Sequence, residues 1–139
     1  MKNREIVFES CEEPWQAIDI TEKVQDSLEE TDNGFVLVYT THTSTSLMIG
    51  KNTKELLEDY TRAAQNLLTL GRPYRHSQHG HQSGEQHAFC FISGFEVLVP
   101  ICNGKLMLGE EQRIFFFEST GGKRPRTIWL FNVKGECIA

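Results

Sequence analysis

The chain contains 139 residues, of which 39% are hydrophobic and 24% charged, and its formal net charge at pH 7 is −5. These values are typical of a globular protein and predict a single domain over residues 1–139 with an ordinary apolar core. The negative charge excludes a general nucleic-acid-binding protein, and no apolar run approaches the roughly 18 residues of a membrane helix. We therefore expect neither a nucleic acid nor a membrane as a partner.

The four cysteines form no CxxC pair. Cys90 and Cys102 lie in apolar runs, where a buried, reduced thiol is the expected state. The first residues lack the apolar segment of a secretion signal. Together these features predict a cytoplasmic protein whose cysteines, including Cys11 and Cys137, are structural and not catalytic.

The first half of the chain predicts two strands and a short helix. Residues 5–10 alternate between apolar and polar side chains, as a strand does. A helix is expected to begin near Asp19 or Thr21, which can accept hydrogen bonds from backbone N–H groups, and to end before the turn signal at residues 32–34. Residues 35–39 are a short apolar run after that turn, which is typical of a buried strand.

Residues 54–70 give the clearest helix pattern in the sequence. Apolar side chains recur three and four positions apart, with charged side chains on the opposite face. Asn52 or Thr53 can cap the first turn, and Gly71 and Pro73 are stop signals. We therefore expect one long amphipathic helix that covers part of the core.

The second half predicts a loop and then a series of strands. Residues 74–87 have no apolar periodicity and contain two glycines, which indicates a loop. The apolar runs that follow, separated by turn signals such as Asn-Gly at 103–104, lie at residues 88–92, 95–101, 105–108, 114–117 and 127–133. The pattern predicts an α+β, β-rich fold, an antiparallel β-sandwich-like domain with two helices.

Histidines concentrate around the expected site. The loop carries His76, His79, His81 and His87, and His42 follows the strand at residues 35–39 within a run of hydroxyl side chains. We predict that the two stretches meet and form one polar site, although a half-exposed strand and a solvated loop would have the same composition. Imidazoles bind Zn²⁺ and similar metals, orient anions, or transfer protons near neutral pH. The residues alone leave these alternatives open.

Three motifs, in this order and spacing, resemble the YjbQ family, also called UPF0047 or the secondary thiamine-phosphate synthase family. They are His-Thr-Ser-Thr-Ser-Leu at residues 42–47, Tyr-Arg-His with Gly-Glu-Gln-His-Ala within residues 74–88, and Val-Pro-Ile-Cys-Asn-Gly-Lys-Leu-Met-Leu-Gly at residues 99–109. The resemblance extends over about residues 5–134. It implies a compact β-sandwich-like α+β domain assembled as a homotrimer, and a side activity that joins hydroxymethylpyrimidine diphosphate to a thiazole phosphate.

The resemblance also implies site residues. His42, His87 and Gln112 match family positions and are the catalytic candidates, whereas His79 and His81 look like an insertion particular to this chain. The expected substrate-binding residues are Thr43, Ser44, Arg75, Ser83, Gly84 and Arg126. Residues 50–52 read Gly-Lys-Asn where the family has Asn-Glu-Asn. The missing carboxylate argues against identical substrate use.

Three functional hypotheses follow. The first is a thiamine-phosphate synthase-type transferase acting on small phosphorylated metabolites, with cationic side chains and Mg²⁺ on the phosphates and a histidine as acid or base. The second is a divalent metal such as Zn²⁺ held by His42, His76 and His87, with a hydrolytic or sensing role. The third is a non-catalytic trimeric binding protein. The first hypothesis leads, mainly through the resemblance.

Overall fold

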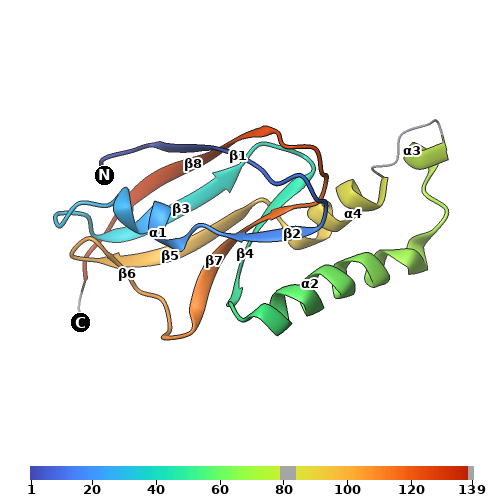
Figure 1. Cartoon of the computed structure of the whole chain (residues 1–139). Helices are drawn as coiled ribbons and strands as arrows, with labels where there is room; N and C mark the ends of the chain where they lie inside the picture. Colours follow the sequence, from blue (N-terminus) through green and yellow to red (C-terminus); the bar gives the residue numbers. More distant parts are fainter. Residues whose placement is uncertain (79–83, 138–139) are drawn as a thin grey trace.

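The structure is a computed structural model that describes residues 1–78 and 84–137. Its strands form two antiparallel sheets (Figure 1). The five-stranded sheet has the order β1 (Glu5–Glu9), β8 (Pro125–Lys134), β3 (Gly34–Thr40), β5 (Glu96–Cys102) and β6 (Lys105–Leu106). The three-stranded sheet has the order β2 (Gln16–Asp19), β7 (Gln112–Glu118) and β4 (Thr45–Lys51).

Helices connect and cover these sheets. They are α1 (Thr21–Asp26), α2 (Lys54–Leu67), α3 (Arg75–Gln78) and α4 (Gly84–Ser93), with a 3-10 turn at Leu68–Gly71. Figure 1 shows α2, α3 and α4 at the end of the molecule away from both termini. The predicted α+β architecture of antiparallel sheets with few helices is confirmed. No helix in the described ranges is long and apolar enough to cross a membrane.

The main core lies between the two sheets. In β3, alternation places Val36 and Val38 inside, both fully buried, while Phe35 and Tyr39 on the other face are exposed. The opposing sheet contributes Phe116 and its neighbours, and α1 closes one side of the core. The period of two in a strand therefore decides which side chains enter the sandwich.

The three-stranded sheet is buried on both faces. Phe116 packs into the sandwich, whereas Phe117 points to the other face and packs with Trp15 and Ala64 beneath α2. This explains why residues 115–117 are a continuous aromatic run instead of an alternating one. The long amphipathic helix is confirmed as α2, and its expected cap is present because Thr53 Oγ1 accepts a hydrogen bond from the Leu56 N–H at 3.2 Å.

The segment expected as a strand at residues 88–92 is instead part of α4, so that prediction was wrong. Aromatic and branched side chains favour a strand locally, but tertiary packing decided the outcome. Cys90 is fully buried and Phe89 packs against the second core cluster, while Phe91 is 82% exposed on the helix surface. The short strand β2 was not predicted, and part of the expected loop forms α3.

The cysteine prediction was also wrong in part. Cys102 forms a disulfide with Cys137, with their Cα atoms 5.3 Å apart, whereas Cys11 and Cys90 are free thiols. Strand pairing brings Cys102 near the C-terminal segment, because Gly34 of β3 pairs with Ile101 of β5 on one side and with Lys134 of β8 on the other. Spacing along the sequence cannot reveal this proximity. The reduced state on which the cytoplasmic prediction rested therefore does not hold for Cys102.

One sheet face is left open. The outer face of the five-stranded sheet exposes a group of large apolar side chains from four strands. They are Val7, Phe35, Tyr39, Leu98, Trp129, Phe131 and Val133. The strand register places Phe131 opposite Leu37, and Leu37 opposite Leu98, so the group is continuous across the sheet. We call it the outer apolar face.

Candidate functional site

The candidate site lies where the chain crosses from one sheet to the other. β3 belongs to the five-stranded sheet and β4 to the three-stranded sheet, so residues 41–44 form a corner between them. Two buried hydroxyls hold this corner, because Thr40 Oγ1 and Thr45 Oγ1 lie 2.8 Å apart. Thr40 Oγ1 accepts the His42 N–H at 3.3 Å, and Thr45 Oγ1 donates to the His42 carbonyl at 3.0 Å. Some of the hydroxyl side chains flagged in the sequence are therefore structural.

The His42 ring is fixed by the backbone of β8. Its Nε2 atom accepts a hydrogen bond from the Thr127 N–H at 3.1 Å. An accepting nitrogen carries no proton, so the neutral ring holds its hydrogen on Nδ1. Burial and the nearby positive charge of Arg126 lower the pKa of His42, against a smaller opposing effect of Glu118. His42 is thus held neutral, and its Nε2 lone pair is already used.

His87 forms its hydrogen bond through the other ring nitrogen. It lies on α4, and its Nδ1 atom is 3.1 Å from the Thr43 carbonyl oxygen. A carbonyl only accepts, so Nδ1 carries the hydrogen and the Nε2 lone pair of the neutral ring is not used in this bond. The His76 ring packs edge-on against it, with centroids 5.3 Å apart. The structure therefore brings the corner, α3 and α4 together, as the sequence predicted for the two stretches.

A buried ion pair lies behind the corner. Arg126 Nε donates to Glu118 Oε2 and Arg126 Nη2 donates to Glu118 Oε1, both at 2.7 Å, with side-chain exposures of 7% and 0%. The same Nη2 also donates to Ser44 Oγ at 3.2 Å and to Thr120 Oγ1 at 3.3 Å. Glu118 neutralises the charge of Arg126, and Arg126 supports the corner from behind through Ser44. The expected role of Arg126 in substrate binding stays a prediction.

The neighbouring thiol is inert. Cys90 Sγ lies 3.7 Å from Ser119 Oγ in the buried layer, and burial raises the pKa of Cys90 to about 11. A thiol with such a pKa is protonated at neutral pH and is a poor nucleophile. Ser119 Oγ in turn donates to the Ser44 carbonyl at 2.5 Å. This agrees with the structural role predicted for Cys90.

Glu118 and Ser119 were missed by the sequence reasoning. The available signal was a charged residue directly after an aromatic strand, at residues 115–118. A carboxylate at the buried end of such a strand requires a cationic partner, because an unpaired buried charge is very costly. The following strand supplies that partner at Arg126.

Gln112 lies at the other end of the three-stranded sheet. Gln112 pairs with Lys51, whereas Glu118, near the corner, pairs with Thr45. Six strand steps separate the two ends, a distance of about 20 Å. Gln112 Oε1 accepts the Gly109 N–H at 2.8 Å and so closes a local turn. The structure does not bring Gln112 to His42 and His87 within one chain.

Arg113 at that distant end is also engaged. Its Nε donates to Asp19 Oδ2 at 2.7 Å, and its Nη2 pairs with Glu22. Burial alone would raise the pKa of Asp19, but the hydrogen bonds from Arg113 and Thr21 lower the pKa to about 2. Lys51 pairs with Glu111 at 3.0 Å in the same region.

Other expected binding residues lie at the edge of the site. Arg75 is exposed at the start of α3, directly before His76, and Thr43 presents its carbonyl to His87. Gly84 begins α4 and is buried. Ser83, like the histidines at 79 and 81, lies outside the described residues. Arg72, which precedes α3, donates to both carboxylate oxygens of Glu85 in the first turn of α4.

The expected three-imidazole metal site is not formed by the side chains that the structure describes. Within residues 1–78 and 84–137, no group of three or more His, Cys, Asp or Glu is arranged to hold a metal ion. His76 and His87 are in contact, but the Nε2 atom of His42 already accepts the Thr127 N–H. A zinc site normally takes three or four protein ligands, so these two imidazoles do not complete one.

The fold and the corner define a class of small α+β protein in which two antiparallel sheets meet at a turn beside a pair of packed imidazoles. The profile of the family described as UPF0047 protein YjbQ-like matches residues 5–135, and the chain belongs to this family. The resemblance noted in the motifs is therefore confirmed.

Relatives agree with this assignment. A UPF0047 protein of Archaeoglobus fulgidus is 39% identical over 113 residues, which cover 81% of this chain and 88% of the relative. The UPF0047 protein YugU of Bacillus subtilis is 32% identical over 120 residues, covering 83% and 87%.

Solved structures are similar in fold. A hypothetical protein of Aeropyrum pernix has a TM-score of 0.82 and 29% identity, covering 96% of this chain and 100% of that one. An uncharacterised conserved protein of Clostridium acetobutylicum has a TM-score of 0.81 and 25% identity, covering 93% and 98%. These descriptions name a family and assign no reaction.

Proposed function

We propose that the corner binds a small phosphorylated metabolite and that His87 is its acid–base residue. The observation that carries this proposal is the 3.1 Å hydrogen bond from His87 Nδ1 to the Thr43 carbonyl. This bond fixes the tautomer and the ring plane, and it leaves Nε2 as the atom for proton transfer or for hydrogen bonding to a ligand. A histidine oriented in this way by a backbone carbonyl is preorganised for chemistry.

His42 has a different role in this proposal. Because its Nε2 accepts the Thr127 N–H, it positions the corner and does not transfer protons through that atom. The charge for a phosphate comes from exposed cations, since Glu118 already neutralises Arg126. Arg75 directly precedes His76, and Lys123 and Arg124 follow Thr120, whose Oγ1 atom lies 3.5 Å from Ser44 Oγ of the corner. Thr43, Ser44 and Gly84 complete the binding residues within the described ranges.

The reaction class that fits is transfer onto or from a phosphorylated small molecule, of the thiamine-phosphate synthase type. The chain's residues would hold the anionic phosphates with cations, and His87 would give or accept one proton as the leaving group departs. No step is assigned to a bound metal, because the described histidines do not complete a metal site.

A homotrimer is part of the same proposal. Gln112 lies about 20 Å from the corner of its own chain by strand spacing, so a catalytic role for it needs a second copy. The outer apolar face supports self-association, since seven large side chains at 37% to 63% exposure present on the order of 600 Å² of apolar surface. Monomeric proteins rarely expose continuous apolar patches much larger than a few hundred Å².

The binding proposal is tested by calorimetry with inorganic pyrophosphate, and by turnover with hydroxymethylpyrimidine diphosphate and the thiazole phosphate. Wild type should bind pyrophosphate, and His87→Ala should lose turnover at least a hundredfold. Gln65→Ala, an exposed change on α2, is the matched control and should behave as wild type. Wild type that neither binds pyrophosphate nor turns over would refute the proposal.

Elemental analysis of tag-free protein separates the metal alternative. The observation in its favour is the same His87 orientation, which is also that of metal-bound histidines. About one transition metal per chain in wild type, and none in His87→Ala, would show that His87 is a metal ligand and not the acid–base residue.

The trimer is tested by sedimentation. Wild type should sediment as three copies, and Phe131→Lys on the outer apolar face should shift the protein toward monomer. Leu70→Lys is the control, because Leu70 is 86% exposed on the 3-10 turn and lies outside that face. A wild-type monomer at micromolar concentration would refute the assembly.

A further inference from the structure

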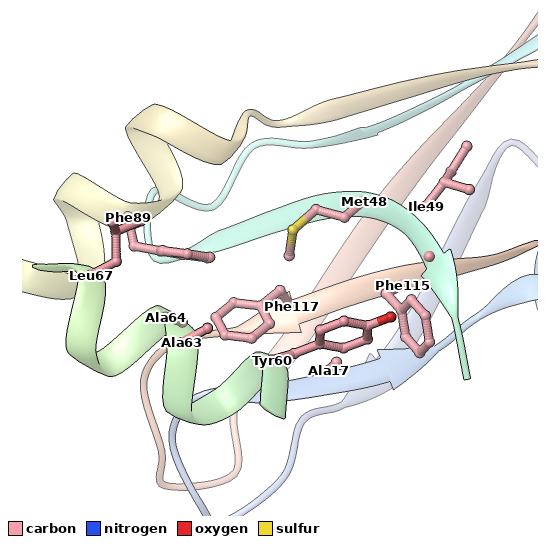
Figure 2. Close-up of a pocket in the computed structure, with 11 residues that line it drawn as sticks. Ala17, Met48, Ile49, Tyr60, Ala63, Ala64, Leu67, Phe89, Phe115 and Phe117 are labelled. Atoms are coloured by element: carbon pink, nitrogen blue, oxygen red, sulfur yellow. The ribbon is translucent and has the colours of Figure 1, made fainter. Parts of the chain in front are cut away.

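A second site lies between α2 and the three-stranded sheet, on the face of that sheet opposite the main core. Figure 2 shows a pocket there, with side chains from α2, β4, β7, β2 and α4 around it. Its volume is about 280 Å³. None of the residues proposed for the phosphate site lines it.

Small side chains create this space. α2 approaches the sheet edge closely, where Thr61 Oγ1 donates to the Trp15 carbonyl at 2.6 Å and Ala64 packs with Trp15. Small residues line the gap on both of its sides, with Ala63 on α2 and with Ala17 of β2 and Gly50 of β4 on the sheet. Larger side chains at these positions would have closed the gap between helix and sheet.

The walls are held apart by fixed aromatic rings. Phe89 of α4 packs against Phe117 with ring centroids 4.9 Å apart, and Trp15 packs against Phe89 at 5.8 Å. At the other end, Tyr60 Oη donates to the Lys51 carbonyl at 2.8 Å, and the Tyr60 ring packs with Phe115. Because these contacts pin the rings, the pocket is preformed and does not depend on a ligand to open it.

The lining determines the chemistry of an occupant. Among the described residues that line the pocket, the only side-chain hydroxyl is that of Tyr60, and it already donates its hydrogen to the Lys51 carbonyl. None of these described lining residues is charged, so an ionic group placed inside would lose its hydration without compensation. Enclosed cavities with such an apolar lining accept hydrocarbons, and the lining of this solvent-accessible pocket favours the same class of ligand.

We propose that this pocket binds an uncharged aromatic or short-chain hydrocarbon ligand. The volume of about 280 Å³ equals roughly nine times the share of one water molecule in the liquid, about 30 Å³, which sets the size at roughly eight to ten non-hydrogen atoms. Entry is from solvent past Leu67, which lines the pocket and is 55% exposed. The inference goes beyond the phosphate site, because it concerns different residues and a ligand of opposite polarity.

The test uses naphthalene and the full chain. Calorimetry should give one naphthalene per chain for wild type, and the methyl signal of Met48, which lines the pocket, should shift on binding. Met107 is 50% exposed and does not line the pocket, so its methyl signal is an internal control that should not move.

Two filling variants locate the binding. Ala63→Leu on α2 and Ala17→Leu on β2 should each weaken naphthalene binding at least tenfold, while Gln65→Leu adds the same side chain to the exposed side of α2 and should change nothing. Pyrophosphate binding should be equal in all four proteins, so failure here is distinguishable from failure of the phosphate site. Using two elements keeps the test valid if one variant does not fold.

Three outcomes would overturn the proposal. The first is that wild type does not bind naphthalene, and the second is that both filling variants bind it as tightly as wild type. The third is a shift of the Met107 methyl signal as large as that of the Met48 methyl signal. If naphthalene fails to bind and Ala63→Leu dissociates an oligomer, the pocket instead receives a side chain of a second copy, and the small-ligand inference is wrong.

Discussion

The ion pair between Arg126 and Glu118 is expected to dominate the stability of the corner. Replacing Arg126 with Ala leaves the Glu118 carboxylate, whose side chain is fully buried, without its bidentate partner. Of the donors that the described residues supply to Glu118, those of Thr120 remain, with the hydroxyl at 2.9 Å and the N–H at 3.3 Å from Oε1. Breaking a buried pair from one side typically costs about 3–5 kcal/mol, and Arg126→Ala should fall in that range.

The destabilisation caused by Arg126→Ala differs from the net contribution of the ion pair to stability, and a double variant separates these two quantities. In Glu118→Leu with Arg126→Met, both charges are replaced by apolar side chains of similar volume. This double change should destabilise less than Arg126→Ala alone, because no uncompensated charge remains. The stability of Arg126→Lys should lie between that of wild type and that of Arg126→Ala, because an ammonium keeps the charge but loses the two-point geometry.

The assay is urea unfolding at pH 7, followed by the fluorescence of Trp15, which is 6% exposed and packed under α2. Lys51→Ala is the control, since its partner Glu111 is 68% exposed and such a surface pair contributes less than about 1 kcal/mol. If Arg126→Ala costs no more than Lys51→Ala, or if the double variant is less stable than the single one, the expectation that this buried ion pair dominates the stability of the corner is wrong.

Further predictions concern protons, a helix cap and the disulfide. Stability should fall as the pH decreases from 6.5 toward 5, because the fold lowers the pKa of His42 and the unfolded chain then binds one proton more than the folded chain. In unfolding measured at several pH values, His42→Gln should flatten this dependence. A wild-type stability that does not change over this range would contradict the prediction. Thr53→Ala should cost about 1 kcal/mol by freeing the Leu56 N–H, with Thr53→Ser retaining most of the stability in the same assay. Reductant should lower wild-type stability by roughly 2–4 kcal/mol and leave Cys102→Ser unaffected, whereas equal responses would show that the bond to Cys137 contributes nothing.

Local patterns predicted the elements whose physics is local. The helix at residues 54–67 follows from its own periodicity and from the Thr53 cap. The Asn103-Gly104 hairpin is also present, and both residues have positive φ, 49° and 74°. A Cβ on Gly104 would lie 2.4 Å from the Glu29 carbonyl oxygen, so glycine is needed there for space as well as for backbone conformation.

The failures share one cause. Residues 88–92 have strand-like composition, yet they form a helix because Phe89 and Cys90 find their partners on β7 and at Ser119, far away in the sequence. Strand register likewise places Gln112, which matched a family position, at the end of the three-stranded sheet away from the corner, so its catalytic role stays a prediction that needs a second copy. Neither fact has a local signature, since both depend on which strands pair.

The sequence by itself determined the fold class, the family and the two stretches that carry the site histidines, because periodicity, turn residues and motif order are properties of the chain. Only the tertiary structure decided what each polar group can do. The histidines 42 and 87 look equivalent in the sequence, yet one accepts a backbone N–H through Nε2 and the other donates to a carbonyl through Nδ1. Both neutral rings therefore carry their hydrogen on Nδ1, but only the Nε2 lone pair of His42 is used in these bonds. This difference depends on partners that folding brings from residues 127 and 43.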